Sequence, residues 1–164
     1  MDHDTADLAA MAREVIDTNR YLVLGTVGPE GAPRVSPVYY GVDEYRDFYW
    51  VSSPTALHSV NVEERPAVNA VVYDSSVQVG HGRAVYLTGR ARRVPDGELA
   101  ARCEVAFRTD LGGRAFTPEE LSGTGDLRLY LLPVEVWEVH LAGRDPRNKS
   151  GVDHRVRIWP TGPA

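Results

Sequence analysis

Short runs of β-branched, aromatic and aliphatic residues recur along this chain, and turns of only a few residues separate most of them. The runs cover residues 21–27, 32–42, 48–52, 67–74, 83–94 and 126–141, and a short last run covers 154–160. Strands joined by short turns pair antiparallel. A single sheet of about six strands would leave exposed edges unless it curled. The pattern therefore predicts a mainly β fold, a small antiparallel barrel with helices packed outside it.

Three segments have helical spacing instead. Leu8, Met11 and Val15 recur at three- and four-residue intervals near the N-terminus, and a second helix is expected from about Pro54 to Glu64, where Pro66 ends it. A third is expected over 96–107. Gly89 interrupts the long run 83–94 and predicts a β-bulge. The 164 residues contain no repeat or linker, so we expect a single domain over residues 1–164.

Composition excludes several classes of function. The formal net charge is −5, from 18 basic and 23 acidic residues, which argues against a general nucleic-acid binder. No apolar stretch approaches the ~20 residues of a membrane span, and the acidic N-terminus lacks the features of a signal peptide, so we expect a cytoplasmic protein without membrane contact. Cys103 is the only cysteine and is expected to be a buried structural thiol. The five histidines lack ligand spacing, so no metal site is predicted.

The segment "WVSSPTALHSVNVEERP", residues 50–66, is the most informative one for function. It joins a strand to a helix and carries four short hydroxyl side chains. One interpretation is structural: Ser53 caps the helix and Pro54 occupies its first position.

The alternative interpretation is a phosphate site. The first amides of a helix lack internal partners and carry partial positive charge, so they bind anions. Hydroxyls of Ser52, Ser53, Thr55 and Ser59 would complete the site. His58 is the only potential cation within the segment, and Arg34 on the preceding strand pair is the obvious guanidinium to bring across. The sequence leaves both interpretations open.

The ordered set "YLVLGTVGPEGAPRVSPVYYGV", "FYWVSSPTALHSVNVEERPAVNAVVYD" and "RAVYLTGRARRV", followed by "VEVWEV", resembles the pyridoxamine 5′-phosphate oxidase-like family of FMN-binding split β-barrels. The resemblance implies an antiparallel split barrel and a homodimer with flavin at the subunit interface. It implies that the strand "RVSPV" lies along the flavin ring and offers an arginine to the phosphate. It also implies contacts from the strand end "WVSS", from the start of the following helix and from a C-terminal tryptophan. The cofactor-binding residues implied are Arg34, Val35, Ser36, Pro37, Trp50, Val51, Ser52, Ser53, His58, Ser59, Asn61 and Trp137.

The resemblance thus implies an FMN-dependent oxidoreductase in which the flavin carries the redox chemistry and a small molecule is the substrate. No catalytic side chain is predicted. One alternative is a reductase that uses a deazaflavin coenzyme, whose acidic tail would need a basic path supplied by the arginines at 90–93 or at 144–147. Another is a non-catalytic flavin or haem binder, with His58, His81 or His140 as the haem ligand.

Overall fold

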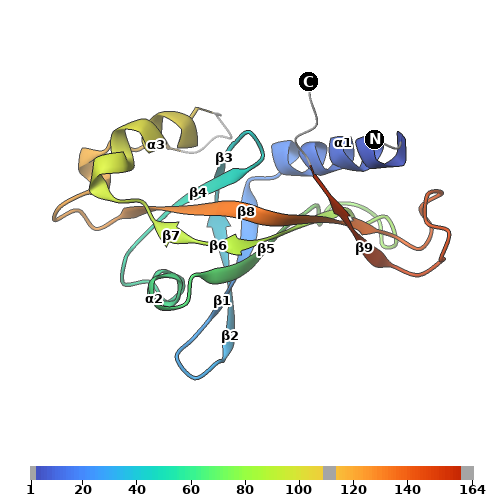
Figure 1. Ribbon diagram of the computed structural model, residues 1–164, viewed down its shortest axis with the longest axis horizontal. Helices are drawn as coiled ribbons and strands as arrows, with labels where there is room; N and C mark the ends of the chain where they lie inside the picture. Colours follow the sequence, from blue (N-terminus) through green and yellow to red (C-terminus); the bar gives the residue numbers. More distant parts are fainter. Residues whose placement is uncertain (1–2, 109–113, 160–164) are drawn as a thin grey trace.

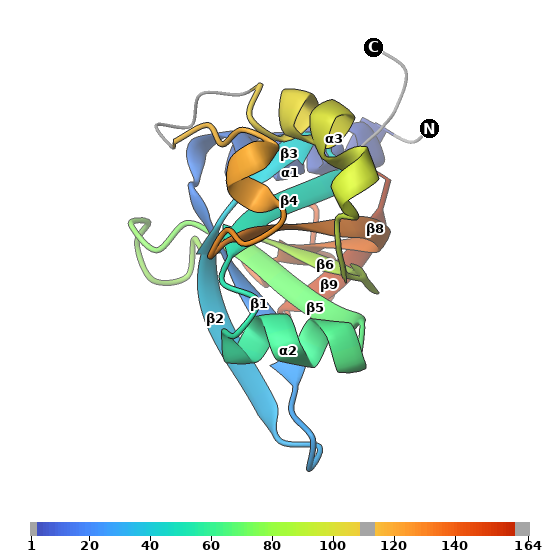
Figure 2. The same cartoon turned by 90° about the vertical axis from the view of Figure 1, so that its left-hand side faces the viewer.

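The strand pattern becomes one curled antiparallel sheet in the computed structural model of this chain, which describes residues 3–108 and 114–159. Within those residues the strands are β1 (Tyr21–Val27), β2 (Pro33–Tyr39), β3 (Gly41–Asp43), β4 (Asp47–Ser52), β5 (Ala67–Tyr73), β6 (Ala84–Arg90), β7 (Arg92–Arg93), β8 (Arg128–Leu141) and β9 (His154–Ile158). Their order is β2-β1-β5-β6-β8-β4-β3, and β7 and β9 also pair with β8. Figure 1 and Figure 2 show the sheet curled into a half-barrel, so the prediction of a mainly β split barrel with peripheral helices is confirmed.

Strand β8 connects the two halves of the sheet. Its first six residues, 128–133, pair with β4, and residues 134–139 pair with β6. The register between β6 and β8 shifts between Thr88 and Gly89. A Cβ atom on Gly89 would lie 2.3 Å from the carbonyl oxygen of Pro133, so only glycine fits at this turn of the sheet. The predicted bulge is confirmed.

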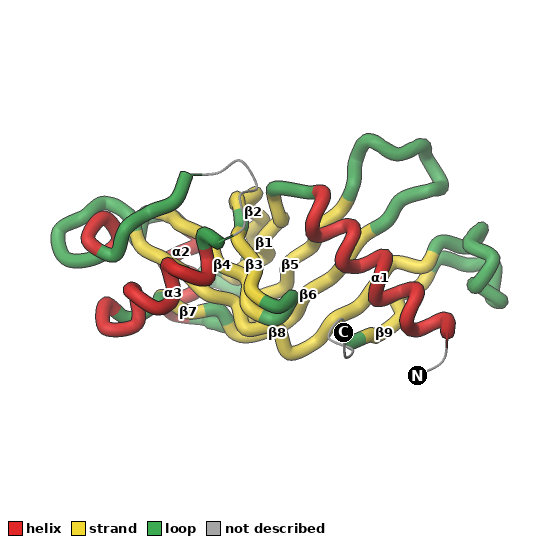
Figure 3. The backbone as a smooth tube through the Cα atoms, turned by 90° about the horizontal axis from the view of Figure 1, so that it is seen from above, coloured by secondary structure: helices red, strands yellow, loops and turns green. Residues whose placement is uncertain are grey.

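Three α-helices cover the sheet at different places. α1 (His3–Thr18) packs on β5, β6 and β9, α2 (Leu57–Glu64) contacts β1, β2 and β7, and α3 (Leu99–Ala106) contacts β3 and β4. Figure 3 shows α1 and α3 over different parts of the sheet. The short 3₁₀ helices η1 (Asp96–Glu98) and η2 (Glu119–Leu121) flank α3 along the chain. None of the described helices is long and apolar enough to cross a membrane.

Two apolar clusters hold these layers together. The larger one joins α1 to the inner face of the sheet, and there the Tyr40 hydroxyl donates to the carbonyl oxygen of Ile16 at 2.6 Å. The smaller one lies between α3 and the β4–β8 pair and includes Cys103, which is 7% exposed. Burial raises the pKa of the Cys103 thiol, so the residue has the structural role that the sequence predicts.

Gly41 permits the close approach of α3 to β3. A Cβ atom there would lie 2.0 Å from the carbonyl oxygen of Ala106. We expect Gly41→Ala to lower the free energy of unfolding by roughly 1–3 kcal/mol, because the backbone must move apart. Gly97→Ala is the control, since nothing lies within 4 Å of its added Cβ atom. Urea unfolding of both variants tests this, and equal stability of Gly41→Ala and wild type would contradict it.

Candidate functional site

The corner between β4 and α2 differs from a capped helix start. α2 begins at Leu57, and its N-cap residue Ala56 makes no side-chain capping bond. The Ser53 hydroxyl instead lies 2.9 Å from the Thr55 hydroxyl and accepts a bond from the Thr55 N–H at 3.3 Å. This local turn uses the Ser53 oxygen before the helix begins. The prediction that Ser53 and Pro54 start the helix is therefore wrong.

The delayed helix start leaves donors available at the corner. The Ala56 N–H bonds to the Ser53 carbonyl, and the Ala56 carbonyl accepts from Ser59 and Val60. Among the described residues, none accepts a bond from the N–H of Leu57 or His58. These are the unpaired first-turn amides that bind anions at a helix N-terminus.

Ser52, the last residue of β4, and His58, the second residue of α2, are bonded to each other across the corner. The Ser52 hydroxyl lies 2.7 Å from Nε2 of His58, which fixes the imidazole beside the end of β4. Burial lowers the pKa of His58, so the folded protein carries it as a neutral imidazole near pH 7. The corner therefore offers hydrogen bonds but little charge of its own.

Arg34 is the cation that strand register brings toward this corner. It pairs with Thr26 across the β1–β2 ladder, and cross-strand partners share a face of the sheet. On that face the Thr26 hydroxyl accepts a bond of 3.0 Å from the side-chain amide of Asn61, which is part of α2. Arg34 thus projects from the side of β2 to which α2 is bound.

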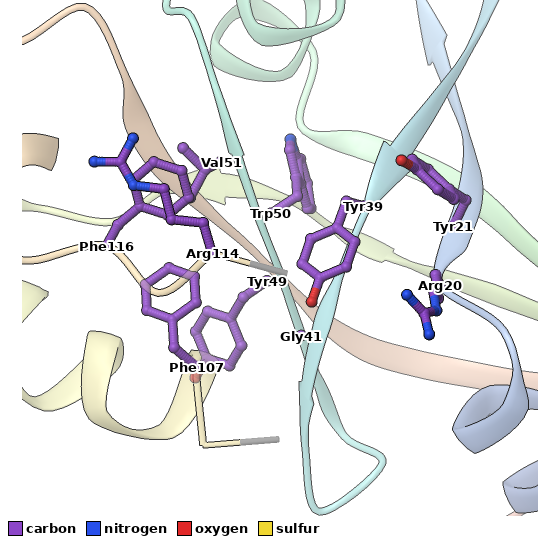
Figure 4. Close-up of a pocket in the computed structure, with 10 residues that line it drawn as sticks. All are labelled: Arg20, Tyr21, Tyr39, Gly41, Tyr49, Trp50, Val51, Phe107, Arg114 and Phe116. Atoms are coloured by element: carbon purple, nitrogen blue, oxygen red, sulfur yellow. The ribbon is translucent and has the colours of Figure 1, made fainter. Parts of the chain in front are cut away.

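An aromatic cavity of about 340 Å³ lies next to the corner. Figure 4 shows side chains from the start of β1, from β2, β4 and the segments after α3 around it. The aromatic members are Tyr21, Tyr39, Tyr49, Trp50, Phe107 and Phe116. Val51 also lines it and directly precedes Ser52, so β4 connects the cavity to the corner. A mostly apolar cavity of this size suits a flat ring system.

One polar atom beside this cavity supports a fit to a flat heteroaromatic ligand. Nε1 of Trp50 is buried and has no hydrogen-bond partner among the described residues. The indole is 1% exposed and stacks on Tyr130 at 5.6 Å between ring centroids. A buried donor without a partner costs about 1–3 kcal/mol, which a ligand acceptor would offset.

Some predicted contacts lie elsewhere. Ser59 is fully buried beneath α2, close to the Tyr130 hydroxyl. Burial raises the pKa of Tyr130, and the nearby Ser59 hydroxyl lowers it by a smaller amount. Asn61 is 3% exposed and holds α2 to β1. Trp137 packs in the core against Phe48, with 5.7 Å between ring centroids. These three side chains are buried in the protein, where they pack or position other elements, and their predicted ligand contacts stay predictions.

The four residues of "RVSP" divide between the faces of β2. Ser36 pairs with Leu24 and shares the inner face with Arg34. Val35 lies on the outer face, where it is 73% exposed and lines a second cavity of about 400 Å³. Pro37 is also exposed. The side chains of this segment therefore lie on opposite faces of the sheet, and only the backbone of β2 is next to both faces.

Sequence reasoning missed the aromatic residues that come from outside the corner. Tyr39 follows the "RVSPV" run directly, and its place in a strand was the available signal. Phe107 and Phe116 follow α3, and their rings pack together at 5.7 Å between centroids. No local pattern marks these two residues, because folding alone brings them to β4.

Comparison with known proteins places the chain in a family. The family model described as pyridoxamine 5′-phosphate oxidase matches residues 8–141, so the chain belongs to this family. No curated protein has a matching sequence. The fold is similar to a pyridoxinephosphate oxidase family protein from Clostridium acetobutylicum related to general stress protein 26. The TM-score is 0.65 at 14% identity, and the match covers 93% of this chain and 96% of that one.

Two other similar structures differ in the ligands that their names state. A heme binding protein from Mycobacterium smegmatis matches with a TM-score of 0.66 at 20% identity, over 92% of this chain and 57% of that one. This chain therefore spans little more than half of that protein's length. An F420 reductase matches with a TM-score of 0.56 at 20% identity, over 77% of this chain and 94% of that one. At these identities the likeness establishes the fold.

The environment of His58 predicts a pH dependence of stability. Because burial lowers the pKa of His58 in the folded state, the unfolded chain binds a proton more readily as the pH falls below 6.5, the ordinary pKa of histidine. The stability that neutral His58 contributes is thus present above that value and is lost as the pH falls through the folded pKa. We expect urea unfolding to show a smaller loss of stability between about pH 7.5 and 5.5 in His58→Gln than in wild type. Equal losses would contradict the burial of a neutral imidazole.

Proposed function

We propose that this protein binds FMN and acts as a flavin-dependent oxidoreductase on a small molecule. The observation that carries the proposal is the junction of two features on one strand. β4 lines an aromatic cavity through Trp50 and Val51 and ends in a corner with unpaired amides and hydroxyls. A ligand with a flat ring and a phosphate tail fits this pairing, and the family includes oxidoreductases.

The phosphate end of FMN would lie at the corner. The N–H groups of Leu57 and His58, the Ser52 and Ser53 hydroxyls and the Arg34 guanidinium would hold it. Since the imidazole of His58 is neutral, Arg34 supplies the charge and His58 contributes a hydrogen bond.

The ring end of FMN would lie in the aromatic cavity beside Trp50 and Val51, along the β2 backbone at 34–37. FMN supplies the hydride or electron transfer when bound. The chain's own residues orient the ring, and the apolar walls exclude water from it. No side chain is assigned as a catalytic acid or base.

The role of Arg34 can be tested by comparing FMN with riboflavin, which lacks the phosphate. We expect Arg34→Gln to weaken FMN binding by roughly 10- to 100-fold, the effect of losing one charge-assisted contact. Riboflavin binding should change little. Fluorescence quenching titrations measure both affinities, and Lys149→Gln is a control with the same change of charge at an exposed position. Equal weakening of both ligands, or of neither, would contradict a phosphate contact at Arg34.

A haem-binding function is the second candidate, because the fold is similar to a heme binding protein. His58 is bonded to Ser52, the residue after the cavity-lining Val51, whereas His81 and His140 line another cavity of about 240 Å³ that three arginines and an aspartate also line. A Soret band that appears with haemin and is lost in His58→Gln would favour this candidate over FMN.

The deazaflavin alternative needs a basic path away from the corner. The arginines at 92 and 93 are engaged by neighbouring carboxylates, Arg92 by Glu98 at 2.8 Å and Arg93 by Asp96 at 3.1 Å. These ion pairs reduce the positive charge that the arginines at 90–93 offer to the acidic tail of a deazaflavin coenzyme. The second arginine group, at 144–147, lies beyond the end of β5 that is far from α2 and the corner. FMN is therefore the coenzyme we propose, and the similarity to an F420 reductase makes parallel titration with both coenzymes informative.

We further propose a homodimer that uses the outer face of β1, β2, β5 and β6. This face carries exposed apolar and aromatic side chains, including Val35 at 73%, Tyr21 at 61% and Tyr73 at 48%. Arg155 stacks on Tyr86 there, with 3.6 Å from its Cζ to the ring centroid. Exposed tyrosine and arginine beside aliphatic residues are typical of interface cores. The same face borders the β2 backbone, so a partner subunit would stand next to the proposed flavin ring.

The dimer face can be tested by adding charge to it. Val35→Glu combined with Tyr73→Glu should convert a dimer into a monomer, because two buried carboxylates would lack partners at the interface. Val79→Glu is the control, since Val79 is fully exposed in the β5–β6 loop. Light scattering after size exclusion gives the mass. A wild-type monomer, or a dimer that survives the double substitution, would contradict the proposed face.

A further inference from the structure

The cavity of about 240 Å³ that His81 and His140 line opens at the other end of the sheet from α2. It lies between the β5–β6 loop, the β8–β9 loop and α1, and these two loops lie together beyond the end of the sheet in Figure 1. α2 precedes the first residue of β5, whereas this cavity follows the last one. Seven residues of strand separate the two places by roughly 20 Å. The cavity is thus a separate site from the proposed phosphate corner.

The lining of this cavity is rich in cations. Three arginines contribute, Arg83, Arg144 and Arg147, beside the imidazoles of His81 and His140, and Asp145 is the only carboxylate among the described residues that line it. The carboxylate of Asp145 forms an ion pair with Arg147. Its two oxygens accept bonds from Nε and Nη2 of that guanidinium at 2.8 and 2.6 Å. These bonds hold the pKa of Asp145 at about 2, so its charge is committed to Arg147.

The acidic partners of these side chains leave several N–H donors unused. Arg83 pairs with Glu14 through Nη1, and His140 lies 3.6 Å from Asp153. Arg144 makes no ion pair or hydrogen bond with any residue in the described ranges, and its Nη1 lies against Gly80. Each guanidinium has five N–H groups, and Glu14 occupies only part of those on Arg83. The unused N–H groups of Arg144 and Arg83 are available to an anion in the cavity.

The loop that carries Arg144 is held in place by its own hydrogen bonds. The side-chain amide of Asn148, 8% exposed, donates to the carbonyl oxygens of Leu141, Ala142 and Val152 at 3.3, 2.9 and 3.0 Å. The carboxylate of Asp153 accepts a bond from the Gly143 N–H at 2.7 Å. The backbone that carries Arg144 is therefore fixed before any ligand arrives, which lowers the entropic cost of binding.

We infer that this cavity binds the phosphate group of a small molecule, with Arg144 as its principal contact and with Arg83 and the two imidazoles as further donors. A guanidinium fork matches the tetrahedral oxygens of phosphate, and the imidazole rings add N–H donors. The volume admits a phosphate with a small attached group and excludes a macrocycle.

The test is a titration of the ¹⁵N-labelled protein with inorganic phosphate, followed by amide chemical shifts at constant ionic strength. Saturable shifts are expected at 80–83 and 142–147, and they report this site separately from shifts at Leu57 and His58. Arg144→Gln should weaken the binding at least tenfold, on the order of one charge-assisted contact. Lys149→Gln removes an equal charge from the same loop outside the cavity and should leave the affinity unchanged.

Three results would overturn the inference. They are shifts that do not saturate, equal weakening by Lys149→Gln, and equally tight binding of acetate, which would assign the site to carboxylates. An unshifted Asn148 side-chain signal in Arg144→Gln verifies that the loop remains folded. Failure at this site would leave the FMN proposal untouched, because the two sites share no residue.

Discussion

The hydrogen-bond ladder along β8 is the constraint on which the rest of the structure depends. One 14-residue strand pairs with β4 through its first half and with β6 through its second. Since the sheet curls between these halves, the end of β4 faces the β1–β2 hairpin although β4 is far from β2 in the strand order. The aromatic cavity and the proposed phosphate corner both lie along this line of contact. The sheet divides at Gly89, where the register between β6 and β8 shifts, and this division leaves the space that a ligand would fill.

The proposed phosphate site at the corner would hold an anion with little charge of its own. Its groups are two unpaired amides, short hydroxyls and an imidazole that burial keeps neutral, so local charge comes from a helix terminus and from one arginine on another strand. The Asn61–Thr26 bond ties α2 to β1 beside that arginine. A residue that sequence alone assigns to the ligand therefore acts by holding two elements together. In this proposal, the affinity of the corner for an anion depends on where the donor groups lie more than on their net charge.

The strands, the bulge at Gly89 and the buried thiol of Cys103 could be predicted from the sequence, because alternation, glycine and apolar context act locally. The start of α2 could not, since Ser53 and Thr55 form a turn that competes with a capping bond. The orientation of Ser59 depends on which face of α2 meets the sheet. Trp137 lies in the core because its strand register turns it inward, and no neighbouring residue reveals that register. The cavity at Arg144 joins two loops that are more than fifty residues apart.

A crystal structure of the protein with bound FMN would test the phosphate corner most directly. The expected result is phosphate density in contact with the amides of Leu57 and His58 and with the Ser52 hydroxyl, with the Arg34 guanidinium turned toward it and the ring against Trp50 and Val51. Density for the phosphate at any other place, or a corner filled by the protein's own side chains while FMN binds elsewhere, would contradict the assignment.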